Sequence, residues 1–144
     1  MTSLSTIYQD VRGLDITLIP YSIGFVDAAT IEMDGKYAIF LDFEQFETMA
    51  DYTAALAHEV GHCATGATHS VSSAFDLIER HEHRANRWSY ERYLPFSYLN
   101  KLVCRGFSEP WQLAEETGWP ESVIRHALHY YLTTKGLRFS KTAL

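Results

Sequence analysis

The chain has 144 residues, of which 47% are hydrophobic and 14% aromatic, and it carries a formal net charge of −6. This length and composition predict one globular domain over residues 1–144 and argue against disorder. The acidic balance disfavours non-specific attraction to nucleic acid or to an anionic membrane. Because the sequence shows neither a signal pattern nor a long apolar run, we expect a cytoplasmic protein that does not span a membrane.

The N-terminal residues predict a short helix followed by a strand. Residues 3–11 have the spacing of a helix, and Gly13 then breaks it. Residues 15–19 are rich in β-branched side chains and predict a strand that ends at Pro20.

Thr30 to Asp42 predicts an antiparallel hairpin. Two strands, at residues 31–33 and 36–41, flank Asp34-Gly35, a dipeptide suited to the positive φ angles of a two-residue turn. Such a sheet can simply cover the helices. Alternatively, an edge strand beside an active site can pair with an extended peptide substrate through backbone hydrogen bonds.

The next predicted helix is the element around which the chain is organised. It begins near Thr48, whose spacing to Asp51 resembles a capping box, and it ends at Gly66. Within it lies an H-E-x-x-H sequence at residues 58–62. The stripe expected to face the core consists of Met49, Leu56, Val60 and Cys63. Cys63 is therefore expected to pack rather than to bind a metal.

The H-E-x-x-H sequence predicts a metal site. Residues four apart on a helix differ by about 40° in direction, so His58 and His62 can bind one ion. Glu59 lies within a turn of His62, where its carboxylate can act as general base without binding the metal. The pattern also occurs by chance on solvated helices, but residues 54–57 are too apolar for an exposed helix. Zinc is the usual metal of such sites.

A catalytic zinc usually takes a third protein ligand, and a helix predicted over residues 74–93 offers candidates. Glu82 falls on the apolar arc of this helix, where a carboxylate is costly to bury unless it is paired or binds a cation. Glu82 is the expected ligand and Glu79 the next candidate; the alternative is a Glu82 carboxylate bonded to an arginine or to the backbone. Asn86 is expected to orient a ligating histidine. His69 is a weaker candidate, because it follows the motif one residue too late for the metzincin pattern.

These residues resemble a known family. Residues 56–62, followed by Glu82–Trp88 and then Leu94-Pro95, are similar to the ImmA/IrrE metallopeptidases, which have an A-H-E-x-G-H helix and an E-x-x-A-N helix. The resemblance extends over residues 15–133. It implies a zincin-like (gluzincin-like) α+β fold, in which a small antiparallel sheet packs on the H-E-x-x-H helix and on a second ligand-bearing helix, followed by a C-terminal helical pair.

The resemblance also implies a function. It implies that His58, His62 and Glu82 bind zinc and that Glu59 is the general base. Members of the family are often encoded in phages and mobile elements, where they cleave or inactivate a helix-turn-helix repressor. The expected partner is therefore such a repressor, as a protein substrate.

The C-terminal third predicts two helices, at residues 108–117 and 120–134, with helix-turn-helix spacing. A DNA-reading helix should be basic, but this region holds more Glu than Arg and Lys. The residues that suggest packing instead are Trp111, Leu113, Val123, Ile124, Ala127, Leu128 and Tyr131. We expect a structural or partner-docking role rather than direct DNA binding.

The sequence thus predicts a zinc-dependent endopeptidase, in which Glu59 takes the proton of a water as that water attacks a peptide carbonyl. Two other functions stay open: a zinc-containing anti-repressor that binds a repressor without cutting it, and a DNA-binding regulator. A residue that stabilises the oxyanion is also expected. The candidates are Tyr37, Tyr52, His69 and His81.

Overall fold

The computed structural model describes residues 3–66 and 75–140, and these residues form an α+β fold. Its elements are α1 (Ser3–Gly13), β1 (Ile16–Pro20), β2 (Ala28–Met33), β3 (Lys36–Leu41), α2 (Met49–Thr65), α3 (Phe75–Tyr93), α4 (Phe96–Cys104), α5 (Pro110–Thr117) and α6 (Glu121–His129). A 3₁₀ turn, η1 (Phe43–Gln45), precedes α2, and a π-helical turn, η2 (Tyr130–Thr134), extends α6.

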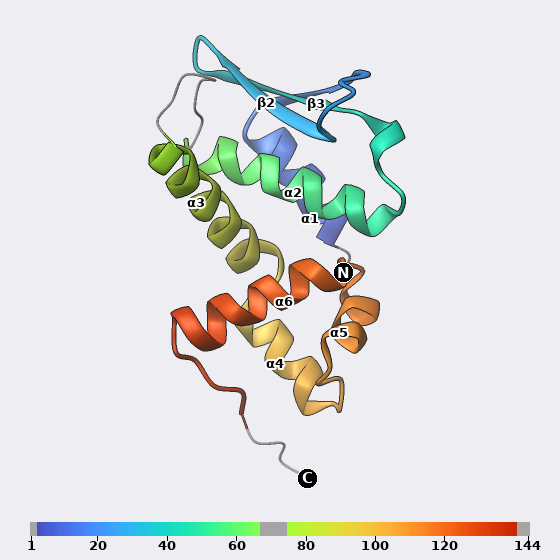
Figure 1. The fold of residues 1–144 in the computed structure, drawn as a ribbon, viewed down its shortest axis with the longest axis vertical. Helices are drawn as coiled ribbons and strands as arrows, with labels where there is room; N and C mark the ends of the chain where they lie inside the picture. The colour runs from blue at the N-terminus through green and yellow to red at the C-terminus, as the bar shows by residue number, and fades with distance from the viewer. Residues whose placement is uncertain (1–2, 67–74, 141–144) are drawn as a thin grey trace.

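The sheet lies over α1 and α2 at one end of the molecule, whereas α4, α5 and α6 form the other end (Figure 1). Helix α3 runs from the first part to the second. Within the described ranges, no helix combines the length and apolar character needed to cross a membrane.

The sheet has the order β1-β3-β2. The predicted hairpin is confirmed, because β2 pairs antiparallel with β3 and both turn residues have positive φ, 53° at Asp34 and 78° at Gly35. The prediction of a purely antiparallel sheet is wrong, because β1 pairs parallel with β3. The chain reverses direction once between β1 and β2 and again at the turn between β2 and β3. Strands β1 and β3 therefore run the same way, and β1 pairs with the edge of β3 that β2 does not occupy. Strand β2 is left at the edge of the sheet.

Asp42 fixes the loop that follows β1. It is buried, and its carboxylate accepts hydrogen bonds from the backbone N–H groups of Gly24 and Ile23, both at 3.0 Å, and of Glu44 at 3.3 Å. These bonds, that of Gly24 first, hold the pKa of the Asp42 carboxyl below its usual value. These bonds, together with the one from the Asp42 N–H to the Asp27 carbonyl at 2.9 Å, tie both ends of the loop between β1 and β2 to the residue that follows β3.

Helix α2 begins and ends as the sequence predicts. The Thr48 hydroxyl caps it by accepting from the Asp51 N–H at 3.0 Å, and Gly66 ends it with a left-handed φ of 66°. Leu56, Val60 and Cys63 are buried, as expected. Met49 is 65% exposed, so its placement on the core stripe is wrong. The first residue of α2 that packs into the core is Tyr52, about one turn after Met49.

Helices α2 and α3 approach each other closely at Gly61. A Cβ atom placed on Gly61 would lie 2.6 Å from the carbonyl oxygen of Ala85, so only glycine allows this distance. On the face of α3 that carries Glu82, Ala85, Ser89 and Tyr93 are buried. The Glu82 side chain itself is 41% exposed, so the predicted inner face is confirmed for its C-terminal part only.

The C-terminal helices share one hydrophobic core with the rest of the chain. Leu113, Ile124, Ala127 and Tyr131 are buried as expected, but Trp111 is 51% exposed and does not pack. Trp119, between α5 and α6, is buried and stacks on Tyr93 of α3, with ring centroids 6.4 Å apart. Helix α4 was not predicted from the sequence; Leu99 and Leu102 are its only buried residues.

Candidate metal centre

Two histidines and one glutamate converge at the crossing of α2 and α3. Glu82 Oε2 lies 2.8 Å from His58 Nε2, and Glu82 Oε1 lies 2.9 Å from His62 Nε2. The two Nε2 atoms are 3.1 Å apart. One donor atom from each residue falls within 4.8 Å of the others, so this group could hold a metal ion.

The local sequence explains this convergence. His58 and His62 are one turn apart on α2, and Gly61 between them lets α3 come near enough for Glu82 to reach both rings. Glu82 shares the inner side of α3 with Ala85, three residues on. The alternative of an arginine partner for Glu82 is not what the described residues show, since its ion pairs there are with the two histidines.

The electrostatics of the group favour a positive charge at its centre. Hydrogen bonds from His58 and His62 hold the pKa of the Glu82 carboxyl well below its usual value. Burial of the His58 ring opposes protonation, but the hydrogen bond to Glu82 and the charge of Glu59 outweigh it and raise the pKa of His58. The negative charges of Glu82 and Glu59, which favour a protonated His58, would also attract a metal cation placed between the three side chains.

Asn86 orients His58, as its place on α3 predicts. His58 Nδ1 lies 2.7 Å from Asn86 Oδ1. An amide oxygen can only accept, so Nδ1 donates and the opposite ring nitrogen, Nε2, is turned toward Glu82 and His62. This arrangement fixes the ring in the orientation that a metal-ligating histidine needs.

Glu59 stands beside this group and outside it. Its side chain is buried, and its Oε2 is 4.0 Å from His58 Nε2. The other oxygen, Oε1, accepts a hydrogen bond of 3.0 Å from the Thr30 hydroxyl of β2. The role of Thr30 had no signal in the sequence, because only the fold brings this strand residue next to α2.

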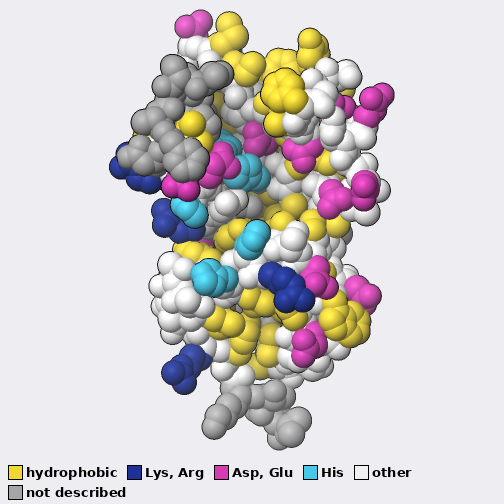
Figure 2. Space-filling model, viewed as in Figure 1, with side chains coloured by type: hydrophobic (Ala, Val, Ile, Leu, Met, Phe, Trp, Pro, Cys, Tyr) yellow, Lys and Arg dark blue, Asp and Glu magenta, His cyan; other side chains and the backbone are white. Residues whose placement is uncertain are grey.

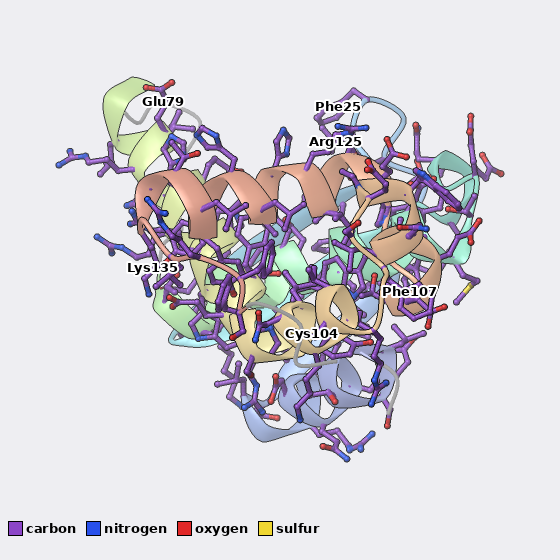
Figure 3. All side chains as sticks on the ribbon, turned by 90° about the horizontal axis from the view of Figure 1, so that it is seen from below. Phe25, Glu79, Cys104, Phe107, Arg125 and Lys135 are labelled. Atoms are coloured by element: carbon purple, nitrogen blue, oxygen red, sulfur yellow. The ribbon has the colours of Figure 1, made fainter. Side chains whose placement is uncertain are left out.

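Most of the other candidates from the sequence lie away from the three donors. Glu79 is exposed, and Figure 3 shows it near the outer end of α3 with its carboxylate turned away from the protein. Tyr52 is buried in the core and bonded to Tyr8 at 2.7 Å. Cys63 is also buried, and burial, followed by the charge of Glu59, raises the pKa of its thiol to about 12. His69 lies outside the described residues.

A cavity of about 450 Å³ opens beside the candidate metal centre. His58, Glu59 and Asn86 line one side of it, and Trp119 and His126, from the C-terminal helices, line another. Of the suggested oxyanion-stabilising residues, Tyr37, Tyr52 and His81 do not line it. His126 does, and sequence reasoning missed this residue. Histidine and acidic side chains gather across the middle of the face seen in Figure 2.

Comparisons of the chain with protein-family models, with curated proteins and with solved structures give no match in any of the three.

Proposed function

We propose that this protein is a zinc-dependent endopeptidase with a zincin-like fold, of the ImmA/IrrE type that its motifs resemble. The observation that carries the proposal is the convergence of His58, His62 and Glu82, with Glu59 next to them at the wall of a cavity. Two imidazoles and one carboxylate are a usual set of three protein ligands for a catalytic zinc.

The donor chemistry of the group fits zinc. Nitrogen ligands from imidazole and one carboxylate suit Zn²⁺ better than the all-oxygen sets that Ca²⁺ and Mg²⁺ prefer. The second ring nitrogen of His58 has the amide partner typical of ligating histidines. When bound, zinc supplies Lewis acidity, which lowers the pKa of a water toward neutrality and polarises a carbonyl group.

The residues of the chain would divide the remaining work. Glu59 accepts the proton of the attacking water and passes it to the leaving amine. The Thr30 hydroxyl donates a hydrogen bond to Glu59 Oε1. The other oxygen, Oε2, lies on the side of His58 and would take the proton. Strand β2, which carries Thr30, has no partner strand on its outer side within residues 3–66 and 75–140, so its backbone groups there can pair with an extended peptide.

A substitution at Glu59 tests the proposal. We expect Glu59→Gln to retain about one zinc per chain, because Glu59 is not among the three donors, and to lose peptide hydrolysis. Zinc is measured by elemental analysis and hydrolysis by mass spectrometry of a diverse peptide mixture. Glu79→Gln, an exposed change on α3, is the matched control and should keep both properties. Hydrolysis by Glu59→Gln at the wild-type rate would refute the mechanism.

The resemblance also supports a proposal for the partner, a helix-turn-helix repressor of a phage or mobile element in the cytoplasm. The protein could act on such a repressor by cutting it or only by binding it. The same variant separates the two modes. Relief of repression by Glu59→Gln would favour binding alone, and its loss would favour cleavage.

A further inference from the structure

Helix α3 presents three polar side chains to the cavity beside the candidate metal centre. Asn86, Ser89 and Tyr90 all line this cavity, and their spacing of three and four residues places them on one side of the helix. We call these three residues the polar row. Asn86 stands at the end nearest the metal centre, because its Oδ1 lies 2.7 Å from His58 Nδ1. Since Glu82 precedes all three, the polar row starts beside the metal centre and continues away from it along α3.

Two hydroxyls of the polar row are buried without a partner. Ser89 is 3% exposed and Tyr90 is 8% exposed, yet no hydrogen bond joins either hydroxyl to another residue in the ranges 3–66 and 75–140. In keeping with this, burial is the cause that raises the pKa of the Tyr90 hydroxyl. Neither hydroxyl is among the described polar atoms that lack a partner and are also closed to solvent. Because both residues line the cavity, a molecule inside it can reach these hydroxyls.

The chemistry of the polar row suits a neutral hydrogen-bond acceptor. The Nδ2 group of Asn86 can only donate, and the hydrogen bond that Asn86 makes to His58 uses its other polar atom, Oδ1. The two hydroxyls can donate as well. An anionic acceptor is disfavoured, because carboxylates, Glu59 among them, line the cavity and its described lining residues include no Lys or Arg. A carbonyl oxygen is neutral and only accepts, and a peptide main chain offers one at every residue.

The spacing of the polar row matches that of an extended main chain. Asn86 and Tyr90 are one turn apart, which corresponds to about 6 Å along the axis of α3. In an extended peptide, carbonyl groups that point to the same side recur every two residues, or about 6.6 Å. Two carbonyls of one strand can therefore meet the two ends of the polar row. On the side of α2 the cavity is lined by Ala54 and Ala55, whose small side chains leave room for a main chain.

We propose that the polar row binds the main chain of an extended peptide substrate, by donating hydrogen bonds to its carbonyl oxygens on one side of the bond that is cut. Asn86 holds the carbonyl nearest the metal centre, and Ser89 and Tyr90 hold the carbonyl two residues further along. Recognition of main-chain groups gives affinity without selecting particular side chains. This inference rests on the proposed function, because it takes the metal centre to mark the reacting bond.

The test uses alanine peptides of increasing length that carry a hydroxamate, a zinc-binding group, at one end. The hydroxamate fixes that end at the metal centre, and the small side chains leave the main chain as the source of further affinity. Two series carry the hydroxamate at the N-terminal or at the C-terminal end, so that both sides of the metal centre are covered. Binding is measured by isothermal titration calorimetry with zinc-loaded Glu59→Gln, in which no hydrolysis interferes. In one series, we expect affinity to rise about fivefold or more once the peptide reaches Tyr90, since one neutral hydrogen bond contributes a factor of about 2–10.

Two double variants, both made in the Glu59→Gln protein, isolate the hydroxyls. Ser89→Ala with Tyr90→Phe removes both hydroxyls of the polar row and should cancel the rise in affinity with length. The matched control, Ser97→Ala with Tyr98→Phe, removes the same two groups from α4, outside the cavity, and should keep the rise. A second probe replaces the peptide group that faces the polar row by a neutral trans-alkene. This probe should bind about fivefold more weakly than its parent to the control, and equally to the variant without the two hydroxyls.

The outcomes separate the polar row from the proposed function. Affinity that does not rise with length in either series, or that rises equally without the two hydroxyls, would overturn the main-chain site and leave the endopeptidase intact. An equal loss in the matched control would also overturn the site. A rise that depends on Ser89 and Tyr90, with no hydrolysis of any peptide by wild type, would support the site and overturn the proposed function. Acetohydroxamate, which has no peptide part, reports on the metal centre alone, so its failure to bind would overturn the proposed function and this inference with it.

Discussion

Gly61 sets the distance between the helices that carry the proposed zinc ligands, and Gly61→Ala tests this directly. The added Cβ would lie 2.6 Å from the carbonyl oxygen of Ala85 and 3.2 Å from its carbonyl carbon. The neighbour is backbone and cannot rotate away as a side chain can. An ordinary contact begins near 3.4 Å, so α2 and α3 must separate by about 0.8 Å at this point.

Two effects of this change on stability oppose each other. Replacing glycine by alanine inside a helix stabilises the fold by about 0.5–1 kcal/mol. The steric overlap costs about 1–3 kcal/mol. We therefore expect a net loss between about 0 and 2.5 kcal/mol in the free energy of unfolding, which for a chain of 144 residues lowers the Tm by at most about 10 °C.

The effect on zinc should be larger than the effect on stability. Metal-ligand distances in proteins vary by only about 0.2 Å, so a shift of about 0.8 Å takes Glu82 out of range while both histidines stay on α2. We expect zinc affinity to fall at least about tenfold, measured by competition with a chromophoric chelator. Gly13→Ala is the control, since no atom lies within 4 Å of the added Cβ there. Unchanged zinc affinity in Gly61→Ala would refute the idea that this contact places Glu82.

Three further predictions concern single side chains. Asn86→Ala removes the acceptor of His58 Nδ1–H, so zinc affinity should fall about 10–100-fold by the same chelator assay while the Tm changes little; unchanged affinity would contradict the orienting role. Burial opposes ionisation of Asp10, but hydrogen bonds from Arg92 and Tyr93 outweigh this effect and lower the pKa of the Asp10 carboxyl. The ionised Asp10 therefore stabilises the folded state at pH values above the unfolded pKa, about 3.9, and this contribution is lost as the pH falls below that value. Asp10→Asn should therefore cost about 1–2 kcal/mol in urea unfolding at pH 7 and almost nothing near pH 2; an equal cost at both pH values would argue against the ion pair. Cys63, with its raised pKa and buried thiol, should resist iodoacetamide at pH 8 until the protein unfolds, as mass spectrometry of the alkylated peptides would show, whereas rapid native labelling would contradict its placement in the core.

The features that were predictable from sequence are those that depend on local periodicity and turn chemistry. The turn at Asp34-Gly35 could be predicted from these two residues alone, because few other dipeptides accept two positive φ angles. Glu82 could be placed on the inner face of α3 because helical phase puts it beside Ala85 and Ser89, which are buried. Asn86 follows from the same reasoning, one turn further along the helix.

The features that escaped prediction depend on how distant segments meet. The parallel pairing of β1 with β3 depends on which side of the hairpin the first strand joins, and no local pattern encodes that choice. Met49 and Trp111 look like core residues in a helical pattern, yet they are 65% and 51% exposed, because no other element among the described residues buries them. Thr30 and His126 reach the site from a strand and from a late helix, so their roles became visible only with the fold.

The position of β2 at the edge of the sheet, which allows it to pair with a peptide, also allows it to pair with other copies of this protein. Its outer side has no partner strand among the described residues, and Ile31 and Met33 are 45% and 70% exposed. Such an edge accepts any extended chain, including the same strand of another copy, and can seed aggregation. The charge of Glu32 on each copy opposes that pairing. Concentrated preparations should therefore tolerate low salt better than high salt, because salt screens this repulsion.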